Sequence, residues 1–102
     1  MDEALWESLS SHEYTVVDNP TDPHLEQYLA IIKALINRAL ERHRAKSAPY
    51  WSPKGTFRQM VYVNQVNHAL DQLVADIRDG HPATRLAQRM DAIRGLIVDL
   101  WM

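Results

Sequence analysis

Apolar residues recur every three or four positions along most of the chain, a spacing that places them on one face of an α-helix. One such stretch runs from His24 to about Ala45, a second from Thr56 to Asp79, and a third has Pro82 just inside its start. The apolar positions of the first are Leu25, Tyr28, Leu29, Ile32, Leu35, Ile36, Ala39 and Leu40. Those of the second are Val63, Val66, Ala69, Leu70, Leu73 and Ile77, and those of the third are Leu86, Met90, Ile93, Ile97 and Leu100, widened by Leu96 and Trp101. Each stretch predicts an amphipathic helix.

Turn residues separate these stretches. The segment 16–23 contains two prolines and is predicted to interrupt the helices, with Asp22 as N-cap and Pro23 as the first helical residue. Gly80 suits the left-handed position after a helix. Ahead of the prolines we expect a short helix with an apolar face formed by Leu5, Trp6 and Leu9. The prediction is an all-α fold over residues 1–102: a single-domain, small antiparallel bundle of three long helices plus a short N-terminal helix.

Composition narrows the classes of protein further. Hydrophobic residues make up 46% and charged residues 24% of the chain, as in an ordinary globular domain. The absence of cysteine excludes a disulfide framework, a thiolate nucleophile and a cysteine-based zinc site. The acidic start Asp2-Glu3 does not resemble a signal peptide, and no apolar run is long enough to cross a bilayer. We therefore expect a cytoplasmic protein without membrane association.

Charge is distributed unevenly along the chain. The residues before Lys33 include seven acids and no Lys or Arg, a net charge of −7. From Lys33 to Arg58 there are seven basic residues against Glu41 alone, a net charge of +6. The basic segment is therefore where we expect a partner to bind.

Basic and aromatic residues alternate near the turn between the first two long helices. This combination can dock an acidic protein surface, because Arg, Tyr and Trp are enriched in binding hot spots. Phe57, Met60 and Val61 also project opposite the core face of their helix, which adds an apolar patch. The predicted partner-binding residues are Arg38, Arg42, Arg44, Lys46, Tyr50, Trp51, Lys54, Phe57, Arg58, Met60 and Val61.

The same residues allow other interpretations. Cations could hold a nucleic-acid backbone while the rings stack on bases. Alternatively, Tyr50 and Trp51 could close the end of the bundle, and the acidic N-terminal segment could fold back and neutralise the cations. The short N-terminal helix could also cover the apolar patch, which would bring Glu3 and Glu7 near Arg58.

Catalytic and metal motifs are missing from the sequence. The five histidines lie in different segments, and no two of them are three or four residues apart. The best local cluster contains His68 and Asp71, where a general base or metal ligand competes with the simpler interpretation of a solvated helix face. No nucleophile motif or glycine-rich phosphate loop is present. We expect no enzymatic activity, no cofactor and no metal.

The sequence thus favours a non-catalytic protein-interaction module, such as a small helical adaptor, inhibitor or assembly subunit that binds another protein. The alternative is a nucleic-acid-associated helical subunit of a larger ribonucleoprotein complex. A phage or mobile element could encode such a protein as well as a host. The C-terminal helix is apolar enough for a homodimer to form through it, by way of Leu96, Val98, Leu100 and Trp101.

Overall fold

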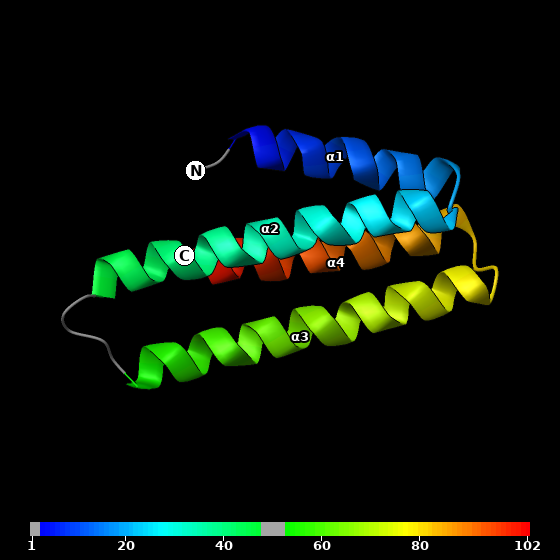
Figure 1. Cartoon of the computed structure of the whole chain (residues 1–102). Coiled ribbons are helices and arrows are strands. Elements are labelled where there is room, and N and C mark those ends of the chain that lie inside the picture. The colour runs from blue at the N-terminus through cyan, green and yellow to red at the C-terminus, as the bar shows by residue number, and fades with distance from the viewer. Residues whose placement is uncertain (1–2, 48–52) are drawn as a thin grey trace.

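The structure is a computed structural model that describes residues 3–47 and 53–102, with side chains described for 3–44 and 57–102. Every secondary-structure element in these residues is a helix, so the predicted all-α class is confirmed. The helices are α1 (Glu3–Asp18), α2 (Asp22–Ser47), α3 (Pro53–Arg78) and α4 (Ala83–Trp101). Consecutive helices run in opposite directions (Figure 1), which gives a bundle with extents of 47 × 25 × 18 Å.

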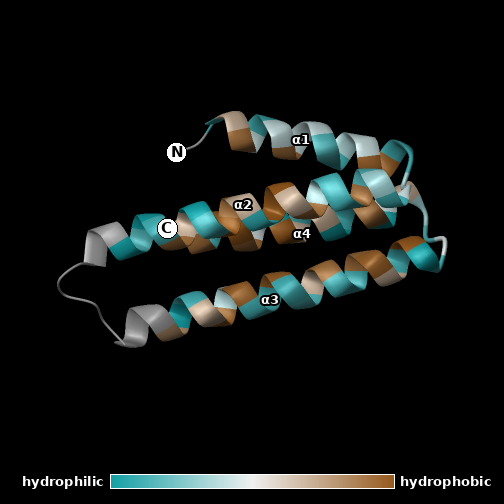
Figure 2. Ribbon diagram, viewed as in Figure 1, coloured by the Kyte–Doolittle hydropathy of each residue, from teal (hydrophilic) through white to brown (hydrophobic). Residues whose placement is uncertain are grey.

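Helix α4 is central to the packing, because it contacts each of the other three helices. It packs most extensively against α3, while α1 lies against α2 and α4. Hydrophobic and hydrophilic residues alternate along every helix (Figure 2), as amphipathic helices require. All of the predicted inner positions of α4 are buried: Leu86, Met90, Ile93, Ile97, Leu100 and Trp101, with Leu96 packed beside them. The predicted inner faces of α2 and α3 are confirmed in the same way.

The N-terminal helix is longer than predicted. It continues to Asp18, and Val16 is fully buried, so the expectation that 16–18 belong to a helix-free segment is wrong. The reason is that Pro20 restricts only itself and the residue before it, Asn19, which leaves the chain free to stay helical up to Asp18. Because Val16 lies seven residues after Leu9, it extends the same apolar face.

The boundaries of the other helices differ from the prediction by a few residues. The prediction that Pro82 lies inside the last helix is wrong: α4 begins at Ala83, and Pro82 is its N-cap with an extended backbone (ψ of 159°). Helix α2 includes Asp22, and the amide of Leu25 donates to the carbonyl of Thr21 at 3.0 Å. Helix α3 begins at Pro53, three residues before the predicted start, since proline suits the first position of a helix. Gly80 has a φ of +71°, as predicted for the residue that follows α3. The amides of Gly80 and His81 donate to the carbonyls of Ile77 and Asp76, at 3.1 and 3.0 Å, which completes a Schellman motif.

Candidate functional site: the groove between α3 and α4

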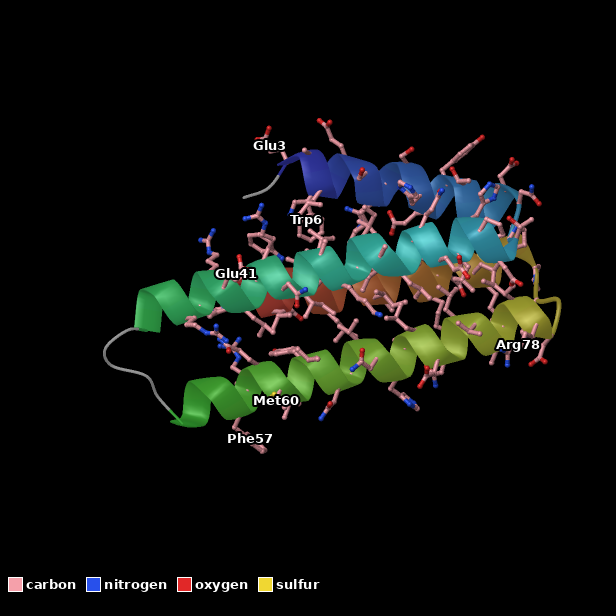
Figure 3. The ribbon with its side chains drawn as sticks, viewed as in Figure 1. Glu3, Trp6, Glu41, Phe57, Met60 and Arg78 are labelled. Carbon is pink, nitrogen blue, oxygen red and sulfur yellow. The ribbon has the colours of Figure 1, made fainter. Side chains whose placement is uncertain are left out.

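Helix α3 exposes large apolar side chains on the face that points away from the bundle. The exposed fraction is 72% for Phe57, 56% for Met60 and 37% for Val61. Figure 3 shows Phe57 and Met60 projecting outward from α3. These residues are spaced by three and four positions, so they share one helix face, whereas Val66 and Leu73 on the opposite face are fully buried. The two-sided apolar character predicted for this helix is therefore real.

Helix α4 supplies the second wall of a groove beside this face. The groove has a volume of about 470 Å³ and opens to solvent. Its walls are Phe57, Arg58, Val61, Tyr62 and Gln65 of α3 and Leu96 and Asp99 of α4. We call this the α3–α4 groove. The sequence identified three of its residues, Phe57, Arg58 and Val61, but not those from α4, because only packing places α4 there.

A smaller hollow of about 70 Å³ adjoins the groove at the C-terminal end of α4. It shares Arg58, Tyr62 and Asp99 with the groove and adds His43 of α2. The Nε2–H of His43 donates to the carbonyl of Leu100 at 2.5 Å, which satisfies one of the last backbone acceptors of α4. This contact fixes the end of α2 to the end of α4 beside the groove.

Arg58 lies at the edge of the groove with its guanidinium 5.6 Å from the centroid of the Tyr62 ring. This cation–π contact orients the side chain. Arg58 is nevertheless exposed, so its charge stays accessible at the groove's rim.

A separate hollow lies nearer the start of α4. This second hollow has a volume of about 380 Å³ and is lined by Thr84, Arg85, Gln88, Arg89 and Ala92. Ala92 precedes Leu96 by four residues, so the two hollows lie along one stripe of α4. The Arg89 Nη1–H donates to Gln72 Oε1 of α3 at 2.9 Å, which shows that α3 borders this end as well.

A buried carboxylate that the sequence analysis missed holds α3 and α4 together beside this second hollow. Asp76 Oδ2 accepts a hydrogen bond from Arg89 Nε at 2.9 Å, and Arg85 Nε lies 3.4 Å from Oδ1. His81 lies 3.9 Å from the same carboxylate. The hydrogen bond from Arg89, together with the charges of Arg89, Arg85 and His81, lowers the pKa of Asp76. Asp76 follows the core residue Leu73 by three positions, so the sequence places an acidic residue on the buried face of this helix. That placement is the signal from which the buried carboxylate could have been predicted.

The predicted cations of α2 whose side chains are described, Arg38, Arg42 and Arg44, do not line the groove. The guanidinium of Arg42 stands 5.9 Å from the centroid of the Trp101 ring, and Arg38 lies 4.0 Å from Glu41. Arg44 is exposed near the end of the helix. Tyr50 and Trp51 lie outside the described residues, as do the side chains of Lys46 and Lys54. The prediction that rings and cations meet at the tip of the hairpin therefore stays a prediction.

The N-terminal helix does not cover the apolar face of α3. Its Trp6 packs against Trp101 of α4, with ring centroids 6.2 Å apart, and Figure 3 shows Trp6 directed toward the other helices. The guanidinium of Arg94 lies 5.8 Å from the Trp6 ring and donates to Glu13 of α1. Helix α1 thus packs against α2 and α4, and the alternative in which α1 covers Phe57 is wrong.

No group of three or more His, Asp or Glu in the described part of the chain could hold a metal ion. His68 and Asp71 are both exposed on α3. Among the described helices, none has the length and hydropathy needed to cross a membrane.

Comparison with known proteins gives one match. Residues 3–101 match a family described as "Protein of unknown function (DUF327)". No curated protein and no solved structure matches the chain.

Proposed function

The chain belongs to the DUF327 family, and we propose that it is a non-catalytic protein-interaction module that holds a segment of a partner protein in the α3–α4 groove. The observation that carries the proposal is the exposure of Phe57, Met60 and Val61 beside an open groove. Burying such a patch on a partner releases roughly 25 cal/mol per Å² of apolar surface, which is the main driving force in most protein association.

The composition of the groove fits an interface better than an active site. Phe57, Val61 and Leu96 supply apolar groups to its walls, and Arg58 and Asp99 supply charged groups. Protein–protein interfaces combine apolar side chains with charged ones, which lie mostly at the rim. The sequence-based expectations of an adaptor, inhibitor or assembly subunit acting in the cytoplasm all fit this proposal.

The proposal is tested by capturing partners from native cells with matched variants. Phe57→Asp combined with Val61→Asp places two charges in the groove, whereas Tyr14→Asp changes an equally exposed aromatic residue on α1. We expect the groove variant to lose the proteins that the wild type captures and the Tyr14 variant to keep them. The free energy of unfolding of each variant should stay within about 0.5 kcal/mol of the wild-type value for each exposed substitution. Capture of every partner by the folded groove variant would refute the proposal.

The alternative function is a nucleic-acid-associated subunit, favoured by the exposed side chains of Arg42 and Arg44 near the end of α2. It predicts retention of single-stranded RNA or DNA that falls steeply as salt rises, because phosphate contacts release counterions. Charge reversal at Arg44 would then abolish retention, while the groove variant would leave it intact. Flat binding curves at low salt would exclude this function for the protein on its own.

A further inference from the structure

We propose that a second contact site for the partner protein lies between α1 and α4, and that this site takes a lysine or arginine side chain of the partner. This inference rests on the proposed function, because it assigns a further contact to the protein that is held in the α3–α4 groove. It follows from the types of residue that line a hollow between the two helices and from the charges of those same residues.

The hollow is separate from the α3–α4 groove, and two helices form its walls. Its volume is about 290 Å³, and it opens to solvent. Helix α1 supplies Glu13, Tyr14 and Val17, and α4 supplies Ala87, Met90, Asp91 and Arg94. We call this the α1–α4 hollow. Sites for small-molecule ligands usually enclose about 300–1,000 Å³, so an open hollow of this size suits a single side chain better than a separate ligand.

The α3–α4 groove is too small to form a stable interface by itself. A stable interface covers about 800 Å² of each partner, contributed by roughly 20–30 residues. Seven residues line the groove, so a protein seated there must contact further surface of this chain. Helix α4 lines the groove with Leu96 and Asp99 and lines the α1–α4 hollow with Met90 and Asp91. Both sites therefore border one helix, and a partner that crosses α4 reaches the second site.

The charges in the hollow leave one carboxylate without a counter-charge. The Arg94 Nη2–H donates to Glu13 of α1 and to Ser10 Oγ at 2.9 Å, and the same guanidinium lies 5.8 Å from the Trp6 ring. The cation of the hollow is therefore already engaged with α1. Asp91 is exposed and makes no ion pair with another described residue. The lining has two acidic residues and one basic residue, a net charge of −1.

Helix α1 makes its side of the hollow more negative. It contains four acidic residues and no Lys or Arg. Glu7 and Asp18 are exposed seven residues before and four residues after Tyr14, so they share its face of the helix. No described residue of the basic segment 33–58 lines this hollow. The α1–α4 hollow and the basic segment therefore favour opposite charges on different parts of the partner.

A lysine or arginine side chain matches both parts of this lining. Its aliphatic stem can lie on apolar surface while its charged end stays near solvent. Val17, Ala87 and Met90 offer apolar surface, and the exposed ring of Tyr14 can contact the stem or the cation. Asp91 supplies the carboxylate, with which an arginine can form two parallel hydrogen bonds.

The test is a selection of displayed random peptides on the purified full chain. The peptides are selected on the Phe57→Asp, Val61→Asp variant, in which the α3–α4 groove is blocked. They are then depleted on the same variant carrying Asp91→Lys as well. We expect the remaining peptides to be enriched in Lys and Arg, because the two proteins differ only at position 91.

The outcomes separate this inference from the proposed function. Failure to select any peptide that depends on Asp91, or selection of peptides without enrichment in Lys or Arg, would overturn the second site. Either result would leave the α3–α4 groove and its native partners unaffected. A dimer of the purified protein that Asp91→Lys abolishes, measured by light scattering, would identify a second copy as the source of the cation and overturn the inference.

Charge variants then test the contact with a selected peptide directly. Asp91→Lys should weaken binding by about two- to fivefold, the size expected for one exposed charge pair. Asp71→Lys is the matched control, since it reverses an exposed charge on α3 that does not line the hollow. A peptide whose Lys or Arg is changed to Glu should bind Asp91→Lys better than wild type. Equal effects of Asp91→Lys and Asp71→Lys would contradict a local contact.

The native partner shows whether one protein uses both sites. A partner that is captured through the α3–α4 groove should also bind Asp91→Lys more weakly than Asp71→Lys, by a similar factor. Tyr14→Asp adds a carboxylate to the hollow, so it should keep the partner bound. Equal affinity of the partner for Asp91→Lys and Asp71→Lys would overturn the assignment of this site to that partner.

Discussion

At the scale of single residues, Asp76 shows how a charge can occupy a core position. It is buried, yet its carboxylate meets Arg89, Arg85 and His81 at the junction of α3 and α4. A charged group in such a place is stabilised only when it is paired and hydrogen-bonded. Since the native partners favour the ionised form, the pKa of Asp76 is lower in the folded protein than in the unfolded chain.

We expect Asp76→Asn to lower the melting temperature at about pH 7, because Arg85 and Arg89 lose their counter-charge. The ionised carboxylate stabilises the fold above the ordinary carboxyl pKa of about 4. This stabilisation disappears as pH falls through the lower pKa of the folded state. The gap between wild type and variant in thermal melts should therefore shrink toward about pH 2.

The matched control for Asp76 is Asp71→Asn on the same helix, where the side chain is exposed. The melting temperature of Asp71→Asn should stay close to that of wild type at every pH. A gap for Asp76→Asn that is constant across the pH series would show that the carboxylate's charge is irrelevant to stability.

Tyr28 is the opposite case, a fully buried side chain whose hydroxyl finds no hydrogen-bond partner among the described residues. Burial raises the pKa of Tyr28 far above its ordinary value, so it stays neutral. Tyr28→Phe should therefore leave the free energy of unfolding unchanged or raise it, since a buried unsatisfied hydroxyl costs stability. Tyr28→Ala should cost about 3–5 kcal/mol by opening a cavity. Denaturant unfolding measures the free energy of unfolding of both variants. A decrease of more than about 1.5 kcal/mol for Tyr28→Phe would show that the hydroxyl makes a stabilising hydrogen bond.

At the scale of elements, α1 is held against α2 and α4 by contacts from Trp6 to Val16. Leu9 and Val16 are fully buried, and Trp6 packs on Trp101 while Arg94 donates to Ser10 at 2.9 Å. Helix α1 lies on α2 and α4 and contributes no residue to the α3–α4 groove. A change in α1 should therefore leave binding in the groove intact as long as the bundle stays folded.

We predict that Leu9→Ala destabilises the protein by about 2–5 kcal/mol, the usual range for removing a buried leucine side chain. Amide hydrogen exchange should show the largest loss of protection in α1 and the adjoining turn of α2, because local unfolding begins where packing was lost. Tyr14→Ala, an exposed change on the same helix, should stay within about 0.5 kcal/mol. Faster exchange in α3 than in α1 would contradict this order of unfolding.

At the scale of the whole molecule, charge and apolar exposure are separated in space. The first 32 residues carry −7, and those described, from Glu3 onward, form α1 and the start of α2. Residues 33–58 carry +6 in the sequence and precede most of α3. Helix α3 is on the opposite side of the bundle from α1 (Figure 1), and its Phe57 and Met60 project away from the bundle (Figure 3). The acidic helix therefore leaves the groove accessible.

The homodimer suggested by the C-terminal helix stays a prediction. Leu100 and Trp101 are buried in the core, and the large apolar side chains well exposed at this end of the described chain are Val98 and Met102.

The separation predicts how salt affects the binding of an acidic partner protein. Raising ionic strength from about 0.05 to 0.5 M shortens the screening length from roughly 14 to 4 Å. The association rate should fall several-fold, whereas the dissociation rate should change little, because the apolar contacts in the groove are insensitive to screening. Stopped-flow fluorescence measures both rates. A salt effect confined to dissociation would argue against electrostatic steering by the basic segment.

The sequence by itself determined the helices and their inner faces. The apolar positions of α2, α3 and α4 were correct because helical periodicity is a local property, set by which residues neighbour each other three and four positions apart. Gly80 was equally predictable, since its left-handed backbone depends on one residue. The length of α1 was underestimated because prolines were read as ending the helix earlier than their local effect requires.

Only the tertiary structure decided where the groove lies and what lines it. Phe57 and Val61 were visible as a second apolar face, but whether α1 or solvent would meet them depended on how the helices pack. Leu96, Asp99 and the pairing of Asp76 with Arg85 and Arg89 come from the contact of α3 with α4. Such contacts join residues far apart in the chain, and the periodicity of a single helix carries no information about which neighbour its face will meet.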